Sequence, residues 1–213
     1  MPRWFSIRPG ITLKGRKFKG IRGWAGKPFH PPLTDVPIGA YTLAAAFDVL
    51  SWWLAPSAGF GADTELTLVG EPFAGFDLPS DLYRAATFCL IAGLVAAVPT
   101  MVTGIWDWWK STPPRTQAWR TANWHGLIMI VSQILGLALV LFRLNIDMQP
   151  HTSFALMLFS LGLFGLIAFG ATYGGGLVYD YAFNVEQDID YAWEKRDTDV
   201  LPGKEKPVAD PTP

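Results

Sequence analysis

Two of the three histidines, His30 and His125, have the side chains and positions best suited to chemistry in this chain. His125 lies in the run Asn123-Trp124-His125-Gly126, about one helical turn (3.6 residues) inside a long apolar stretch. His30 opens a proline-rich run that leads into another apolar stretch. Two imidazoles can ligate a haem iron. Alternatively, both histidines only make structural hydrogen bonds, and the residues alone leave this choice open.

Asp35 is a carboxylate that could join these histidines. It follows His30 by five residues. Two imidazoles and a carboxylate can hold a divalent metal ion, so His30, Asp35 and His125 form a second candidate ligand set.

Asp107 lies in the aromatic run WDWW, at the end of a further apolar stretch. The tryptophans are typical of a membrane interface, but an aspartate is not. Its carboxylate could orient a cofactor-binding histidine from behind. It could also cap a neighbouring helix or pair with Arg115 or Arg120.

Asp48 is an acid deep inside an apolar stretch. It lies 11 residues past Pro37, about 16 Å along a helix. A charged group at the centre of a bilayer costs about 2.5 to 3.5 kcal/mol on insertion scales. We therefore expect Asp48 to be protonated, to pair with Arg84 or Arg143, or to act as a proton-relay or ligand carboxylate.

The composition identifies the elements that must position these residues. Hydrophobic residues make up 50% of the 213 positions, charged residues only 16%, and the mean hydropathy is +0.24. Because soluble domains carry about 25% charged residues, we predict a membrane protein. The single cysteine, Cys89, excludes a disulfide scaffold and a thiolate zinc site. No phosphate-binding loop or nucleic-acid module is recognisable.

Four stretches are apolar and long enough to cross about 30 Å of hydrocarbon as helices. They cover about residues 37–54, 83–109, 122–142 and 153–179. None shows the alternation of a barrel strand. The predicted fold is therefore all-α, a bundle of four transmembrane helices.

Basic residues are concentrated before the first span and between spans two and three, whereas the loop between spans one and two is acidic. By the positive-inside rule, both termini and the second loop should face the cytoplasm. Topology then gathers His30, Asp35, Asp107 and His125 at the cytoplasmic end. The basic positions are Arg3, Arg8, Lys14, Arg16, Lys17, Lys19, Arg22 and Lys27, then Lys110, Arg115 and Arg120; the acidic ones are Asp63, Glu65, Glu71, Asp77 and Asp81.

The two tails define the expected domain boundaries. Residues 1–28 form a basic extension with interspersed aromatic residues, suited to an anionic lipid surface or a protein partner. Residues 29–186 form the membrane domain. Residues 187–213 form an acidic tail without apolar periodicity, which we expect to be flexible.

Four motifs in chain order resemble a bacterial four-helix inner-membrane family known as a domain of unknown function. They are residues 30–39 (HPPLTDVPIG) followed by Asp48, residues 103–108 (TGIWDW), His125, and residues 175–179 (GGLVY). The resemblance covers about residues 29–186. It implies a four-helix membrane fold.

The resemblance also bears on function. Some family members are joined to a Rieske-type iron–sulfur domain, which implies membrane electron transfer and favours haem or metal at His30 and His125. Many members carry a second histidine where this chain has Asp35, so a site with several histidines is not implied here. The chain lacks Rieske cysteines, so an iron–sulfur partner would be a separate subunit.

Three functional hypotheses follow, and we expect no catalytic residues. The first is an accessory or structural subunit of an inner-membrane complex, in contact with lipid and other membrane subunits. The second is an electron-transfer module that binds haem b or a divalent metal through His30 and His125, with Asp107 behind them. The third, a carrier of protons or small solutes that uses Asp48, is weakened by the lack of an inverted repeat.

Overall fold

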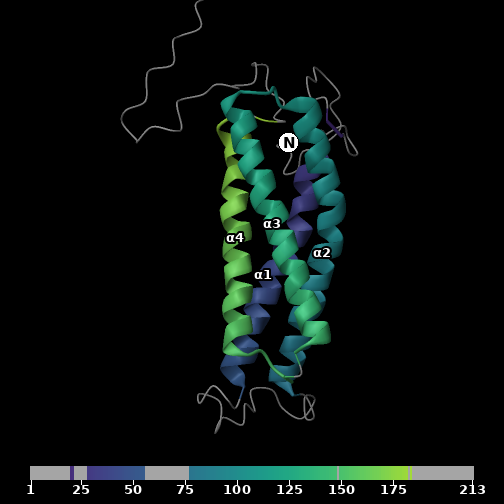
Figure 1. Cartoon of the computed structure of the whole chain (residues 1–213), viewed down its shortest axis with the longest axis vertical. Helices are drawn as coiled ribbons and strands as arrows, with labels where there is room; N and C mark the ends of the chain where they lie inside the picture. Colours follow the sequence, from purple (N-terminus) through teal and green to yellow (C-terminus); the bar gives the residue numbers. More distant parts are fainter. Residues whose placement is uncertain (1–19, 22–27, 56–76, 148, 182, 184–213) are drawn as a thin grey trace, which may run out of the picture. The chain divides into compact units, whose positions relative to one another are not determined.

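The structure is a computed structural model that describes residues 20–21, 28–55, 77–147, 149–181 and 183. It contains four α-helices: α1 (His30–Leu54), α2 (Leu78–Ser111), α3 (Gln117–Asn145) and α4 (Phe154–Tyr179), shown in Figure 1. No strand occurs within the described ranges. The predictions for most of residues 1–28, for the acidic loop at 56–76 and for the tail from residue 184 lie outside them.

All four helices are long and apolar enough to cross a membrane. The shortest, α1, has 25 residues, against about 20 needed for the hydrocarbon layer. Large apolar side chains remain exposed on the helices; Phe88, Val95 and Ile134, for example, are each more than 60% exposed. Such surfaces suit contact with lipid, so the predicted all-α membrane fold is confirmed.

Local side-chain chemistry explains where two of the helices begin. The Thr116 hydroxyl accepts a hydrogen bond from the Trp119 backbone N–H, and Ser153 caps α4 in the same way through Leu156. Both are favoured N-cap residues. α1 begins at His30, and the two prolines that follow occupy its first turn, where a backbone N–H is not needed.

Three of the four expected spans belong to longer helices, since α1, α2 and α3 extend beyond residues 37–54, 83–109 and 122–142, whereas α4 agrees with its expected range to within one residue. The prediction that His30 lies on a lead-in before the first helix was wrong, because His30 is the first residue of α1. Asp107 likewise lies inside α2, which continues to Ser111.

The chain forms two compact units, each built from separate segments. Unit 1 comprises residues 1–32, 100–128 and 169–213, and unit 2 comprises residues 33–99 and 129–168. All four helices contribute to the core of unit 2, which contains Tyr41, Ala44, Leu90, Leu139, Val140, Leu156, Leu163 and Ile167. The smaller core of unit 1 contains Ala118, Leu177, Tyr181 and Phe183.

Tyr41 shows how closely the helices approach in unit 2. Its hydroxyl donates a hydrogen bond to Gln133 Oε1 at 2.6 Å. Its ring lies against two glycines: Cβ atoms added at Gly93 and Gly136 would meet Tyr41 atoms at 3.1 and 3.2 Å. Small residues at such contacts are typical of helix packing in membranes.

Candidate cofactor site

His30 is held against α2 by its Nδ1 atom. This nitrogen lies 2.9 Å from the Thr100 carbonyl oxygen and 3.3 Å from Thr103 Oγ1. The Thr103 hydroxyl itself donates to the same carbonyl. Because a carbonyl oxygen only accepts, Nδ1 of His30 carries the proton. In the neutral ring, the lone pair is then on Nε2.

His125 is held against α4 in the same way. Its Nδ1 atom lies 2.9 Å from the Gly170 carbonyl oxygen, so Nδ1 is again the protonated nitrogen. Among the described residues, the hydrogen bonds of both imidazoles involve Nδ1 alone. Both Nε2 atoms therefore keep a lone pair that could bind a metal ion.

Each imidazole also packs on a glycine one helical turn beyond its carbonyl partner. A Cβ atom added at Gly104 would lie 2.7 Å from His30 Cε1, and one added at Gly174 would lie 3.0 Å from His125 Cε1. A Cβ atom at Gly104 would force a shift and one at Gly174 would press closely on the ring, so each glycine makes room for an imidazole.

The two histidine environments are related by constant offsets in the sequence. The carbonyl and the glycine on α4 lie 70 residues after those on α2, and His125 lies 95 residues after His30. The same offset of 95 residues relates Asp48 to Arg143. The α1–α2 and α3–α4 hairpins thus use one pattern twice.

The structure brings His30 and His125 into the same unit. They lie close enough for their positive charges to repel each other if both were protonated. Asp35 lies five residues after His30 on α1 and belongs to unit 2. In the described part of the chain, no group of three or more His, Cys, Asp and Glu side chains could hold a metal ion. The donor set that remains is a pair of imidazoles, which suits haem iron better than a bare divalent ion.

Asp107 has a different partner from those expected. Its Oδ1 atom accepts a hydrogen bond from the Ile21 backbone N–H at 2.9 Å. Its carboxylate is 2% exposed, and Oδ2 has no hydrogen-bond partner within the described ranges. The groups that orient the histidines are the Thr100 and Gly170 carbonyls rather than Asp107.

Asp48 is fully buried in unit 2 and pairs with Arg143, one of the two partners expected for it. The Thr152 hydroxyl donates to Asp48 Oδ1 at 2.8 Å, and the Ser160 hydroxyl donates to Oδ2. Arg143 also donates to Thr87 Oγ1 at 3.2 Å. These contacts compensate the buried charges. The other expected partner of Asp48, Arg84, instead lies near Asp81 at the surface.

Sequence reasoning found both histidines but missed the groups that hold them. A backbone carbonyl has no signature in the sequence, so Thr100 and Gly170 could not be identified. The glycines could have been, because His30 and Asp48 are separated by 18 residues, as are His125 and Arg143. That equal spacing indicates a parallel repeat, in which Gly104 and Gly174, 70 residues apart, have matching positions on α2 and α4.

The comparison with protein families agrees with this architecture. Residues 26–187 match the family described as Predicted membrane protein (DUF2231). The chain belongs to this family. The matched region contains all four helices and both histidines of the site, in agreement with the expected boundaries. No curated protein and no solved structure matches the chain.

Proposed function

We propose that this DUF2231 membrane protein binds a b-type haem through His30 and His125 and acts as a one-electron carrier within the membrane. The observation that carries the proposal is the identical support of the two imidazoles. In each, the Nδ1 proton is bound to a carbonyl and the ring lies on a glycine. Histidines that ligate metals usually donate their other N–H to a carbonyl or carboxylate, which fixes the ring and raises its basicity.

Each surrounding residue has a definite task in this proposal. The Thr100 and Gly170 carbonyls select the tautomer in which Nε2 has the lone pair that would bind iron. Gly104 and Gly174 let the rings approach the helix backbone. Haem bound at these two nitrogens would supply reversible one-electron transfer.

The other hypotheses are less well supported. Two histidines that only stabilised the fold would not need the same arrangement of a carbonyl and a glycine around both rings. A proton carrier based on Asp48 has little support, because Arg143, Thr152 and Ser160 already bind this carboxylate. An accessory subunit without a cofactor remains the alternative, and it makes the opposite prediction for the experiment below.

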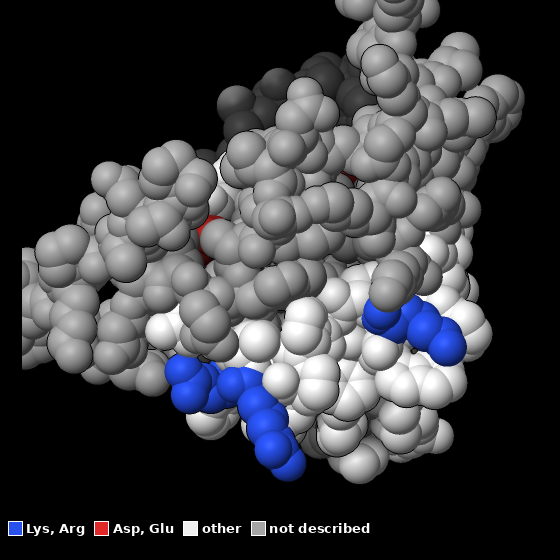
Figure 2. Space-filling model, turned by 90° about the horizontal axis from the view of Figure 1, so that it is seen from above, with Lys and Arg blue, Asp and Glu red and all other residues white. Residues whose placement is uncertain are grey.

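The charge distribution supports a placement in the bacterial inner membrane with the haem near the cytoplasmic face. Lys110, Arg115 and Arg120 lie at or near the α2–α3 connection. Figure 2 shows basic side chains, drawn blue, on the described surface of this end of the molecule. The positive-inside rule assigns the α2–α3 connection, together with both termini, to the cytoplasm. A separate iron–sulfur subunit is the electron partner that the Rieske fusions in the family would imply.

The proposal is tested by haem analysis of the full chain, extracted in mild detergent from cells that make haem b. We expect about one haem per chain and a reduced-minus-oxidised difference spectrum with a Soret shift. Both should be lost in His30→Gly and His125→Gly, because each removes an imidazole that would bind the iron. Imidazole added to the medium should partly restore the spectrum of the glycine variants by replacing the missing ring.

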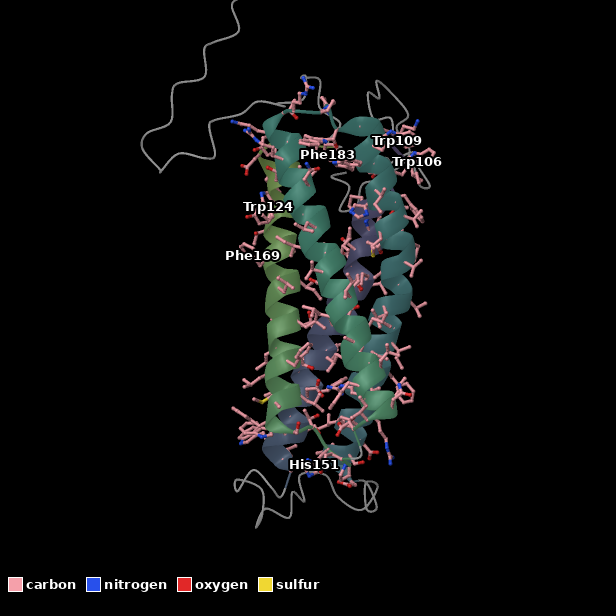
Figure 3. All side chains as sticks on the ribbon, in the orientation of Figure 1. Trp106, Trp109, Trp124, His151, Phe169 and Phe183 are labelled. Carbon is pink, nitrogen blue, oxygen red and sulfur yellow. The ribbon has the colours of Figure 1, made fainter. Side chains whose placement is uncertain are left out.

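His151→Ala is the matched control, because His151 is the remaining histidine and lies in the α3–α4 connection of unit 2 (Figure 3). It should retain the haem. A colourless wild-type protein that is folded and purifies with defined membrane subunits would contradict the haem proposal and favour the accessory subunit.

A further inference from the structure

A pocket of about 400 Å³ lies between the start of α3 and the end of α4, and we call it the interfacial pocket. The residues of its α3 wall follow Gln117 by three, four and seven positions, so they share one face of the helix. All of its residues belong to unit 1. They are Gln117, Arg120, Thr121 and Trp124 from α3, Thr172, Tyr173 and Gly176 from α4, and then Asp180 and Tyr181.

Gly176 leaves room for this pocket. The position 70 residues earlier, which is its counterpart on α2, is Trp106. Lys110, the counterpart of Asp180, places its ammonium group 5.4 Å from the Trp106 ring centre and 4.0 Å from that of Trp109. The two hairpins therefore differ here: a bulky aromatic cluster on α2 corresponds to a glycine and an acid on α4.

The length of α3 and its aromatic residues suit a pocket at the depth of lipid headgroups. α3 has 29 residues and is about 43 Å long, whereas the hydrocarbon layer is about 30 Å thick. The first turns of α3, which contain the polar residues Gln117, Arg120 and Thr121, are suited to the polar layer. Trp124 is 56% exposed and projects outward, as does Phe169 on α4 (Figure 3). A tryptophan at this level is typical of the membrane interface.

The walls of the pocket carry opposite charges. Arg120 contributes a guanidinium from α3, and Asp180 contributes a carboxylate just after α4. A Cβ atom added at Gly176 would lie 3.5 Å from Asp180 Oδ2, so this carboxylate is folded back over the glycine. Trp124 and Tyr173 add aromatic rings, which attract cations. A headgroup that carries one charge of each sign therefore matches both walls.

We propose that the interfacial pocket binds the headgroup of a zwitterionic phospholipid, namely phosphatidylethanolamine. Its phosphate matches Arg120, since guanidinium groups bind phosphate through paired, charge-assisted hydrogen bonds. Its ammonium group matches Asp180 and the aromatic rings. The acyl chains then extend along the exposed apolar surface of the helices. The proposal does not depend on haem at the histidines.

The test is native mass spectrometry of the delipidated full chain, titrated with phosphatidylethanolamine or phosphatidylglycerol of identical acyl chains. We expect one tightly held phosphatidylethanolamine and at least about tenfold weaker binding of phosphatidylglycerol. Arg120→Gln and Asp180→Asn should each weaken phosphatidylethanolamine binding by about tenfold, because each removes a charge-assisted contact. Gly176→Leu should abolish binding by filling the pocket.

Lys110→Gln and Arg115→Gln are matched controls, because both remove a basic residue near the same end of unit 1 but outside the pocket. They should leave the affinity unchanged. Equal affinity for the two lipids, or equal losses in the pocket and control variants, would overturn the proposal. So would a lipid-soluble quinone that co-purifies with the chain and is lost in Gly176→Leu.

Discussion

At the residue scale, His30 and His125 are distinguished by what supports them rather than by where they lie along the helices. In each, a carbonyl fixes the proton on Nδ1 and a glycine accepts the face of the ring. This arrangement reduces the packing between helices at Gly104 and Gly174, because a glycine has no side chain to make contacts. The arrangement is understandable if Nε2 of each ring has a ligand to bind.

The glycines provide a test of this idea that leaves both histidines in place. Gly104→Ala should weaken haem binding by about 10- to 100-fold, the loss typical when a group that supports a metal ligand is disturbed. The reason is the 2.7 Å contact that the new methyl group would make with His30. The measurement is a titration of haem into the apoprotein, followed by absorbance.

Gly165→Ala is the matched control, because a Cβ atom there has no neighbour within 4 Å. It should bind haem as the wild type does. Equal affinity of the two alanine variants would show that the close approach of Gly104 to His30 has no role in binding.

At the element scale, the existence of the helices followed from the sequence, whereas their ends did not. Apolar runs of about 20 residues can only be helices in a bilayer, so four spans were predictable. The end turns are polar and extend beyond the hydrocarbon layer, where hydropathy carries no signal. For this reason His30 was placed before α1, although it begins that helix.

The pairing of elements in unit 2 was only partly predictable. A buried acid needs a partner, and two arginines were candidates for Asp48. The choice of Arg143 depends on the packing of α1 against α3. Thr152 from the α3–α4 connection and Ser160 from α4 bind the same carboxylate, and no sequence pattern indicated these two hydroxyl groups.

The ion pair between α1 and α3 gives a stability prediction. Asp48→Ala and Arg143→Ala should each destabilise the protein by about 3 to 5 kcal/mol, because each leaves a buried charge without its partner. The double variant Asp48→Leu with Arg143→Met should lose much less than the sum of the two. A denaturant titration of each variant in detergent gives the differences in the free energy of unfolding. Thermal unfolding of the same samples gives the order of their stabilities.

The exposed pair Arg84 and Asp81 is the control, with a separation of 3.6 Å between charged atoms. Arg84→Gln should change the free energy of unfolding by at most about 1 kcal/mol, as is usual for surface pairs. Single variants at Asp48 and Arg143 that were as mild as Arg84→Gln would contradict the structural role assigned to the buried pair.

At the scale of the whole molecule, the arrangement in the membrane follows from charge. The α2–α3 connection is basic and should face the cytoplasm, and the α3–α4 connection should face outward. The chain is convenient for a labelling test, because Cys89 is its only cysteine and can be replaced by serine.

In that background, Arg115→Cys and Gln149→Cys report on the two connections. A membrane-impermeant maleimide should label position 149 in intact spheroplasts and position 115 only in inverted vesicles. The opposite pattern would reverse the orientation and place the histidine site near the outer face.

The central claim is that His30 and His125 bind one haem iron together. It is tested most directly by the low-temperature electron paramagnetic resonance spectrum of the oxidised, haem-containing protein. We predict the low-spin ferric signal of two imidazole ligands, lost in His30→Ala and in His125→Ala and retained in His151→Ala. Wild-type protein without haem, or a low-spin signal that survives loss of either histidine, would contradict the claim.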